Sequence, residues 1–190
     1  MTELNHTDKT FEKIVYAEKT IKNREFENCI FKQCDLSNSI FMNGRFTDCE
    51  FIGCNLSMLK LSSCSLVNVV FKECKILGVN FSECTDFLFS VRFENSLLDY
   101  SSFMNKKMPK TQFLNTSLKN VSFVKTNLAN AKFIKTDLSE AIFNETDLKE
   151  ADLSTAFNYF IDPELNNIRK AKFSIEGAVS LLAKYNIKIE

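Results

Sequence analysis

Residues 113–153 carry the sequence FLNTS-LKNVS-FVKTN-LANAK-FIKTD-LSEAI-FNETD-LKEAD-L. Every fifth residue of this stretch is Phe or Leu, and the residue two positions before each of them is small or β-branched. The other three positions of each five are mostly polar. A period of five matches neither the 3.6-residue period of an amphipathic helix nor the two-residue period of a half-buried strand. A fixed short repeat of this kind predicts a solenoid.

A square coil accounts for the period if each five-residue unit forms one side. Four units then complete a turn of about 20 residues, and residue i lies one strand spacing of about 4.8 Å from residue i+20. The apolar residues point inward and fill the interior. We expect one face to stack Phe93, Phe113 and Phe133, and the opposite face to stack Phe103, Phe123 and Phe143. The predicted aromatic core centres include Phe31, Phe51, Phe71, Phe113, Phe123, Phe133 and Phe143.

Several units combine a small residue, an Asp or Asn, a Leu and two polar residues. The clearest are TNLAN at 126–130, TDLSE at 136–140 and ADLST at 151–155. In these units, and across roughly residues 20–157, the sequence resembles the pentapeptide-repeat family. The resemblance implies an all-β solenoid, a right-handed quadrilateral parallel β-helix. It also implies C-terminal α-helices that cap the rod and join two copies.

Three segments follow from the extent of the period. Thirteen apolar centres run from Ile21 to Phe81 and thirteen more from Phe93 to Leu153, which is about six and a half turns at five residues a side. The sequence therefore predicts a repeat domain over 21–157. Residues 1–20, which include His6, are expected to form a tail and a degenerate cap. Residues 158–190 are expected to form a helical capping and dimerisation segment.

Two irregularities interrupt the repeat. Phe93 follows Phe81 by 12 positions, two more than two units, so we expect a bulge or small loop near 84–92 with Asp86 turned outward. At residues 105–109, Lys106 occupies an inward slot, where an unpaired ammonium would be costly. We expect a distorted corner with Lys106 turned to water, and both a tolerated defect and a binding loop remain open.

Beyond Phe157 the pattern changes to helical signals. Asp162-Pro163-Glu164 is typical of a helix start and predicts a helix over 163–170. A second helix is expected over 175–184, and the alternation at 187–189 predicts a brief terminal strand. An apolar side left over by the capping helices would pair two copies by two-fold symmetry. The residues expected at that dimer interface are Val179, Leu181, Leu182, Tyr185 and Ile187.

Catalytic and metal-binding signals are weak. The chain has one histidine, four glycines and seven cysteines. Each cysteine lies two positions before a centre of the strict register (Asp86 in the case of Cys84), where Thr, Val or Ala stands in the second half, so we expect seven buried packing residues. The chain has neither a phosphate-binding Gly-rich loop nor paired C-x-x-C motifs. We therefore expect no enzymatic activity, no metal and no cofactor.

The chain has no net charge, but its charged residues are unevenly distributed along the sequence. Lys and Arg together number 24, as do Asp and Glu, so no global field favours nucleic acid or a membrane surface. No apolar run is long enough to span a membrane, and we expect a cytoplasmic protein. Lysines between 101 and 136 fall on all four predicted faces, which disfavours direct nucleic-acid binding. An acidic collar is predicted close to the C-terminal segment: Asp137, Glu140, Glu145, Asp147, Glu150 and Asp152.

The resemblance extends to function. The repeat and the tail around Asp162 are similar to the topoisomerase-protecting branch of the family, the Qnr, MfpA and McbG type. This implies a non-catalytic, DNA-mimic-like protein that binds DNA gyrase or topoisomerase IV and protects it from quinolones or peptide toxins. In a dimer, two acidic collars would then meet the enzyme. The alternative is a repeat scaffold that serves an unidentified protein partner.

Overall fold

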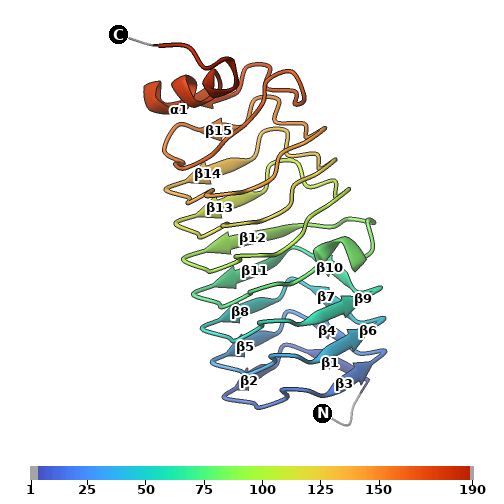
Figure 1. The fold of residues 1–190 in the computed structure, drawn as a ribbon. Helices are drawn as coiled ribbons and strands as arrows, with labels where there is room; N and C mark the ends of the chain where they lie inside the picture. The colour runs from blue at the N-terminus through green and yellow to red at the C-terminus, as the bar shows by residue number, and fades with distance from the viewer. Residues whose placement is uncertain (1–3, 189–190) are drawn as a thin grey trace.

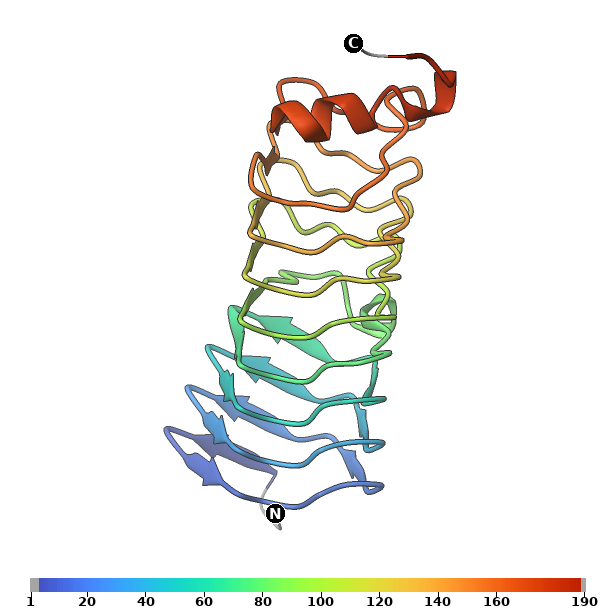
Figure 2. The same cartoon turned by 60° about the vertical axis from the view of Figure 1, so that its left-hand side comes forward.

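The chain forms a rod. A computed structural model describes residues 4–188, which wind through about eight turns and end in one short helix (Figure 1). Turned by 60°, the coils are seen stacked along a common axis, with the helix lying across the last coil (Figure 2). All pairs between named strands are parallel. The predicted parallel β-helix is confirmed, and it is longer than the six and a half turns expected.

The rod has four faces, numbered here in chain order. Face 1 carries a four-stranded sheet: β1 (Asn5–Thr7), β4 (Glu25–Glu27), β7 (Arg45–Thr47) and β10 (Ser65–Val67). Face 2 carries a nine-stranded sheet that follows the length of the rod: β2 (Thr10–Glu12), β5 (Ile30–Lys32), β8 (Glu50–Ile52), β11 (Val69–Lys72), β12 (Val91–Glu94), β13 (Gln112–Leu114), β14 (Lys132–Ile134), β15 (Asp152–Leu153) and β16 (Lys172–Phe173).

The remaining faces are built more from single bridges than from strands. Face 3 consists of parallel bridges that connect successive coils from Val15 to Phe157. Face 4 begins with a three-stranded sheet: β3 (Thr20–Lys22), β6 (Ile40–Met42) and β9 (Lys60–Ser62). Above it follow the 3-10 helix η1 (Phe81–Glu83) and bridges from Asn80 to Ile142. Faces 1 and 3 are opposite each other, as are faces 2 and 4.

Aromatic rings form two ladders inside the rod. On face 2 the rings stack from Phe11 to Phe133, with centroid separations between 4.5 and 5.4 Å. The second ladder changes face along the rod. It runs through His6, Phe26 and Phe46 on face 1, and then through Phe81, Phe103, Phe123 and Phe143 on face 4. The opposite stacks predicted for the second half are confirmed.

Where the slot two positions before a centre holds Cys or Thr, it provides a hydrogen-bond donor as well as a small volume. The Cys54 thiol donates to the Phe31 carbonyl at 3.3 Å, 23 residues earlier in the chain. The Thr126 hydroxyl makes the same contact with the Phe103 carbonyl at 2.8 Å. Cysteine and threonine are thus equivalent in this slot, since each satisfies a buried carbonyl of the preceding coil.

The corners use left-handed backbone. The residue two positions after most centres has a positive φ, as at Asn28 (51°) and Asn115 (52°). Asparagine tolerates this conformation better than other non-glycine residues because its short side chain can hydrogen-bond locally. The corner positions therefore explain why so many outward residues of the repeat are Asn.

The register break lies near the position predicted from the sequence. β11 pairs with β12 at an offset of 22 residues, so two extra residues enter between them. The resulting bulge exposes Asp86, as expected, with 70 % of its side chain accessible. The prediction that Lys106 turns to water is wrong, because its side chain is only 2 % exposed. Its ammonium donates to the Cys84 carbonyl and, at 2.8 Å, to the Asp86 carboxylate, so the buried charge is paired.

The first coil is more regular than the sequence suggested. β1 and β2 lie within the segment 1–20 and pair in register with the second coil. His6, expected in a tail, is 4 % exposed and stacks on Phe26 at 5.0 Å. The described part of this segment thus begins the solenoid.

At the C-terminal end, the solenoid continues further along the chain than predicted. The prediction of a helix over 163–170 is wrong, because Asn167 still forms a bridge with Asp147 and β16 still pairs with β15. Asn166 enters the inward slot, where its amide donates to the Phe143 carbonyl at 3.2 Å. Only then does the helix α1 (Ile175–Ser180) form, followed by the 3-10 helix η2 (Ala183–Tyr185). Residues 187–188 form no strand, and Ile189 lies outside the described residues.

Substitution of Lys106 separates its charge from its volume. For Lys106→Met we expect the free energy of unfolding to stay within about 1 kcal/mol of wild type, because a buried ion pair adds little net stability. Lys106→Ala leaves a cavity beside Phe89 and is expected to cost about 3 kcal/mol. Urea denaturation followed by circular dichroism measures both variants. An equal loss in the two would show that the charge, and not the packing, supports the bulge.

Candidate interaction surface

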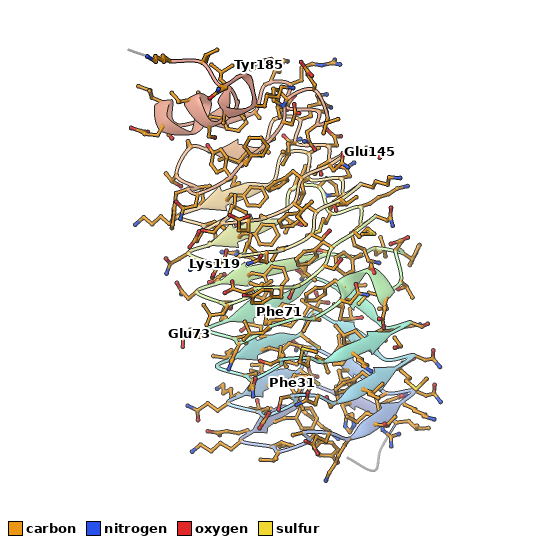
Figure 3. All side chains as sticks on the ribbon, viewed as in Figure 1. Phe31, Phe71, Glu73, Lys119, Glu145 and Tyr185 are labelled. Carbon is orange, nitrogen blue, oxygen red and sulfur yellow. The ribbon has the colours of Figure 1, made fainter. Side chains whose placement is uncertain are left out.

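Contacts with other molecules fall to the outside of the rod, because the side chains of the chain itself fill the interior. Phe31 and Phe71 point into the rod, whereas Glu73, Lys119 and Glu145 point away from it (Figure 3). Among residues 4–188, no group of three or more His, Cys, Asp or Glu side chains could hold a metal ion. Nor does any helix there have the length and apolar character needed to cross a bilayer.

The seven cysteines are free and buried, as the register predicted. Burial raises the pKa of the Cys64 thiol to about 11. A thiol with this pKa stays protonated at neutral pH, and the thiolate is the reactive form. Cys64, whose thiol donates to the Phe41 carbonyl at 3.3 Å, is therefore a packing and hydrogen-bonding group in the folded chain.

The predicted acidic collar surrounds the rod. Asp137, Asp147 and Asp152 lie on faces 3, 1 and 2 respectively, each on the bridge or strand just before an inward Leu. Three glutamates occupy left-handed corners with φ between 53° and 59°: Glu140, Glu145 and Glu150. The structure thus distributes the six acids around the perimeter and not along one face.

Lysines compensate much of the collar. The Lys119 ammonium lies 3.3 Å from the Asp137 carboxylate, and the Lys125 ammonium lies 3.6 Å from that of Glu145. Lys125 occupies the corner one turn before Glu145, so the 20-residue register sets this pair. Exposed pairs of this kind add little stability, but they offset charge. The collar is therefore a mixed-charge surface, with Glu140 among its exposed acids without an ion pair in the described chain.

The aspartates of the collar also maintain the turns. The Asp152 carboxylate accepts hydrogen bonds from the Ser154 hydroxyl at 2.6 Å and the Ser154 amide at 3.1 Å, which lower the pKa of Asp152. At Asp137, burial alone would raise the pKa, but hydrogen bonds from Ser139 and Asn158 outweigh it and the net shift is downward. Both carboxylates stay ionised at neutral pH, and each has a structural task in its turn.

The C-terminal helix α1 lies very close to the last coil. The Ser174 hydroxyl caps α1 by accepting a hydrogen bond from the Gly177 amide at 3.0 Å. A Cβ atom on Gly177 would lie 1.7 Å from the Tyr159 hydroxyl oxygen. Only glycine fits at this position, so α1 can lie directly on the last coil.

Four of the five predicted interface residues are exposed at this end: Val179, Leu182, Tyr185 and Ile187. Leu181 packs against the core instead. Ile175, which the sequence reasoning missed, is the most exposed apolar residue of the helix. Ile175, Val179 and Leu182 are spaced i, i+4, i+7 and therefore share one side of the helical segment.

A charged cluster that the sequence did not suggest ties this end together. The Lys184 ammonium lies 2.7 Å from both the Asp162 and the Glu164 carboxylates, and the Tyr185 hydroxyl donates to Glu164 at 2.8 Å. Hydrogen bonds from Lys184 hold the pKa of Asp162 and of Glu164 below their usual values. The segment expected to start a helix at Asp162 therefore anchors the end of the chain.

Comparison with known proteins places the fold in one family. The family described as "Pentapeptide repeat region" matches residues 24–103, and "Pentapeptide repeats (8 copies)" matches residues 122–157. The chain belongs to the pentapeptide-repeat family. No curated protein matches it in sequence.

Two solved structures show how far the likeness extends. A trypsin-treated form of QnrB1, described as a plasmid-mediated fluoroquinolone resistance protein, is 17 % identical with a TM-score of 0.65. The alignment covers 98 % of this chain and 99 % of QnrB1. HetL, a pentapeptide-repeat protein involved in heterocyst differentiation regulation in the cyanobacterium Nostoc, is 14 % identical with a TM-score of 0.51, over 88 % of this chain and 84 % of HetL. At these identities the likeness concerns the fold.

The Lys184 cluster makes the C-terminal end sensitive to acid. A carboxylate whose pKa is lowered by folding stabilises the folded state above its unfolded pKa, and this stabilisation is lost as pH falls through the folded pKa. We expect α1 to be ordered at pH 7 and to loosen below about pH 4, as measured by amide heteronuclear NOE values in α1. Lys184→Met should loosen α1 already at pH 7, while Lys149→Met serves as a control. Unchanged NOE values in Lys184→Met would contradict this role.

Proposed function

We propose that this protein is a non-catalytic binding protein that engages DNA gyrase or topoisomerase IV and protects the enzyme from quinolones or peptide toxins. The observation that carries the proposal is the end-to-end correspondence of its rod with QnrB1. Side chains fill the interior, and the described residues form no metal-binding cluster, which favours binding of a partner on the outer surface. The proposed location is the cytoplasm, where such an enzyme acts.

The acidic collar is the proposed contact surface. Its three aspartates are held by hydrogen bonds within their turns, so their positions are fixed before any partner binds. Because Lys119 and Lys125 pair with acids of the collar, the proposed contact surface carries less negative charge than a DNA duplex. We expect the exposed corner acids, Glu140 and Glu145, to contribute most, because Asp137 and Asp152 already serve their turns.

A supercoiling assay tests both the activity and the site. Purified DNA gyrase with a fluoroquinolone should recover supercoiling when this protein is added at micromolar concentration. Combined Glu140→Lys and Glu145→Lys should reduce that recovery by roughly tenfold or more, because two charges are reversed. Glu73→Lys is a matched control, since Glu73 is an exposed corner glutamate with φ 55° on an earlier coil. No recovery with wild type would remove the topoisomerase proposal.

We further propose that two copies join at the C-terminal end. The exposed side formed by Ile175, Val179 and Leu182 would meet its copy across a two-fold axis. Such a dimer doubles the length of the rod and brings two collars close to its centre, so that one enzyme could contact both.

Light scattering after size exclusion tests the dimer. Wild type should have twice the chain mass, and Leu182→Glu should have the mass of one chain, because a carboxylate would be buried in the interface. Val15→Glu is a control, since Val15 is 68 % exposed at the other end of the rod. An unchanged mass in Leu182→Glu would argue against this interface.

The alternative proposal is a scaffold for a different protein partner. HetL, which shares the fold, is described as involved in heterocyst differentiation regulation. A gyrase assay without protection or inhibition, together with an intact dimer, would favour this alternative.

A further inference from the structure

A groove lies on face 1 directly below the register break. Its volume is about 510 Å³, within the range of ligand-binding clefts. Phe87 and Leu88 from the bulge line one end of it. The floor is the outward side of β4, β7 and β10, where the strand register places Glu25, Arg45 and Ser65 in one column.

The bulge exposes apolar side chains at a conformational cost. Phe87 is 76 % and Leu88 is 61 % exposed. Leu88 also has a left-handed φ of 55°, which is unfavourable for leucine and is met elsewhere on the rod mainly by Asn, Asp, Lys and Glu. Backbone strain combined with an exposed apolar pair is a feature that occurs at binding sites.

The base of the bulge is fixed. Lys106, buried beneath it, donates to the Cys84 carbonyl and to Asp86, and its ammonium lies 5.0 Å from the centroid of the Phe89 ring. Phe89 itself is 5 % exposed and belongs to the core. Phe87 and Leu88 are therefore presented on a rigid support, which lowers the entropy lost on binding.

The floor of the groove changes chemistry from rung to rung. Nearest the bulge lies Val67, which is apolar, with Ser65 beside it. One rung away is Arg45, an exposed guanidinium that makes no ion pair or hydrogen bond with the described chain, and a rung further is Glu25. An acidic group would be attracted at the Arg45 rung and repelled at the Glu25 rung, so the order of contacts is defined.

We propose that this groove binds an extended segment of a partner protein in which a large apolar side chain is adjacent to an acidic one. The apolar side chain packs between Val67 and the Phe87–Leu88 pair. The neighbouring carboxylate accepts a bidentate hydrogen bond from Arg45. This site lies apart from the acidic collar and does not depend on the proposed topoisomerase partner.

Blocked tripeptides test the site by NMR titration of the ¹⁵N-labelled full chain. The probe is N-acetyl-Asp-Phe-Asp-amide, and the charge control is N-acetyl-Lys-Phe-Lys-amide. We expect saturable shifts at the amides of Thr47, Val67 and Leu88 with the acidic probe below about 10 mM. The basic probe should bind at least roughly fivefold more weakly, because it brings ammonium groups to the guanidinium.

Two variants keep the inference falsifiable. Leu88→Asn suits the left-handed backbone, so it should fold at least as well as wild type yet bind the acidic probe roughly fivefold more weakly. Tyr100→Asn is its matched control, since Tyr100 is 69 % exposed with φ 64° on another corner. Arg45→Glu should reverse the preference between the probes. The absence of localised shifts, equal binding of the two probes, or equal loss in Leu88→Asn and Tyr100→Asn would overturn the proposal.

Discussion

The stacking of each side chain on the residue 20 positions later is the constraint on which this structure depends. The interior is only as wide as the side chains that face each other across it, so every inward position contributes to a continuous ladder. Phe31 has Phe11 on one side and Phe51 on the other, at 4.9 and 4.5 Å. Most polar slot residues enter by satisfying a backbone carbonyl, as Cys54 and Thr126 do for the preceding coil. The hydrophobic and hydrogen-bonding requirements of the core are thus met by the same repeat.

The same register organises the outside of the rod. Corner amides form hydrogen bonds from coil to coil, as from Asn68 to Asp48 at 2.6 Å and from Asn115 to Asn95 at 2.8 Å. Charges follow the same rule, as in the pairing of Lys125 with Glu145. These pairs offset part of the local charge between neighbouring coils. Where the lysine-rich coils meet the collar, a partner therefore meets acids that are partly paired with lysines of the preceding coil.

The sequence predicts the regular part of the fold because an apolar centre every five residues has one simple structural solution. It fails where a polar residue performs the task of an apolar one. Lys106 occupies a slot that seemed to exclude an ammonium, yet it acts as the slot donor and finds Asp86 only because of the bulge. Asn166 replaces Thr in the same slot and extends the coil past a helix-start signal at Asp162, which makes one turn instead. The Lys184 cluster joins residues 22 positions apart, and no local pattern carries that information.

The register break can be understood from the core on either side of it. Before the break, the second aromatic ladder lies on face 1, adjacent to the Phe ladder of face 2, and cysteines fill seven of the inward slots. After the break, that ladder lies on face 4, opposite face 2, and most slots hold Ser, Thr, Val or Ala. On face 1 the inward aromatic ring is therefore replaced by Leu66, and the next inward centre in regular register is Met108. Phe89 and the stem of Lys106 fill the volume between, and the two extra residues that bring Phe89 inward leave Phe87 and Leu88 outside. The exposed apolar pair is thus tied to a rearrangement of the interior, so a change in the core there would also change the surface.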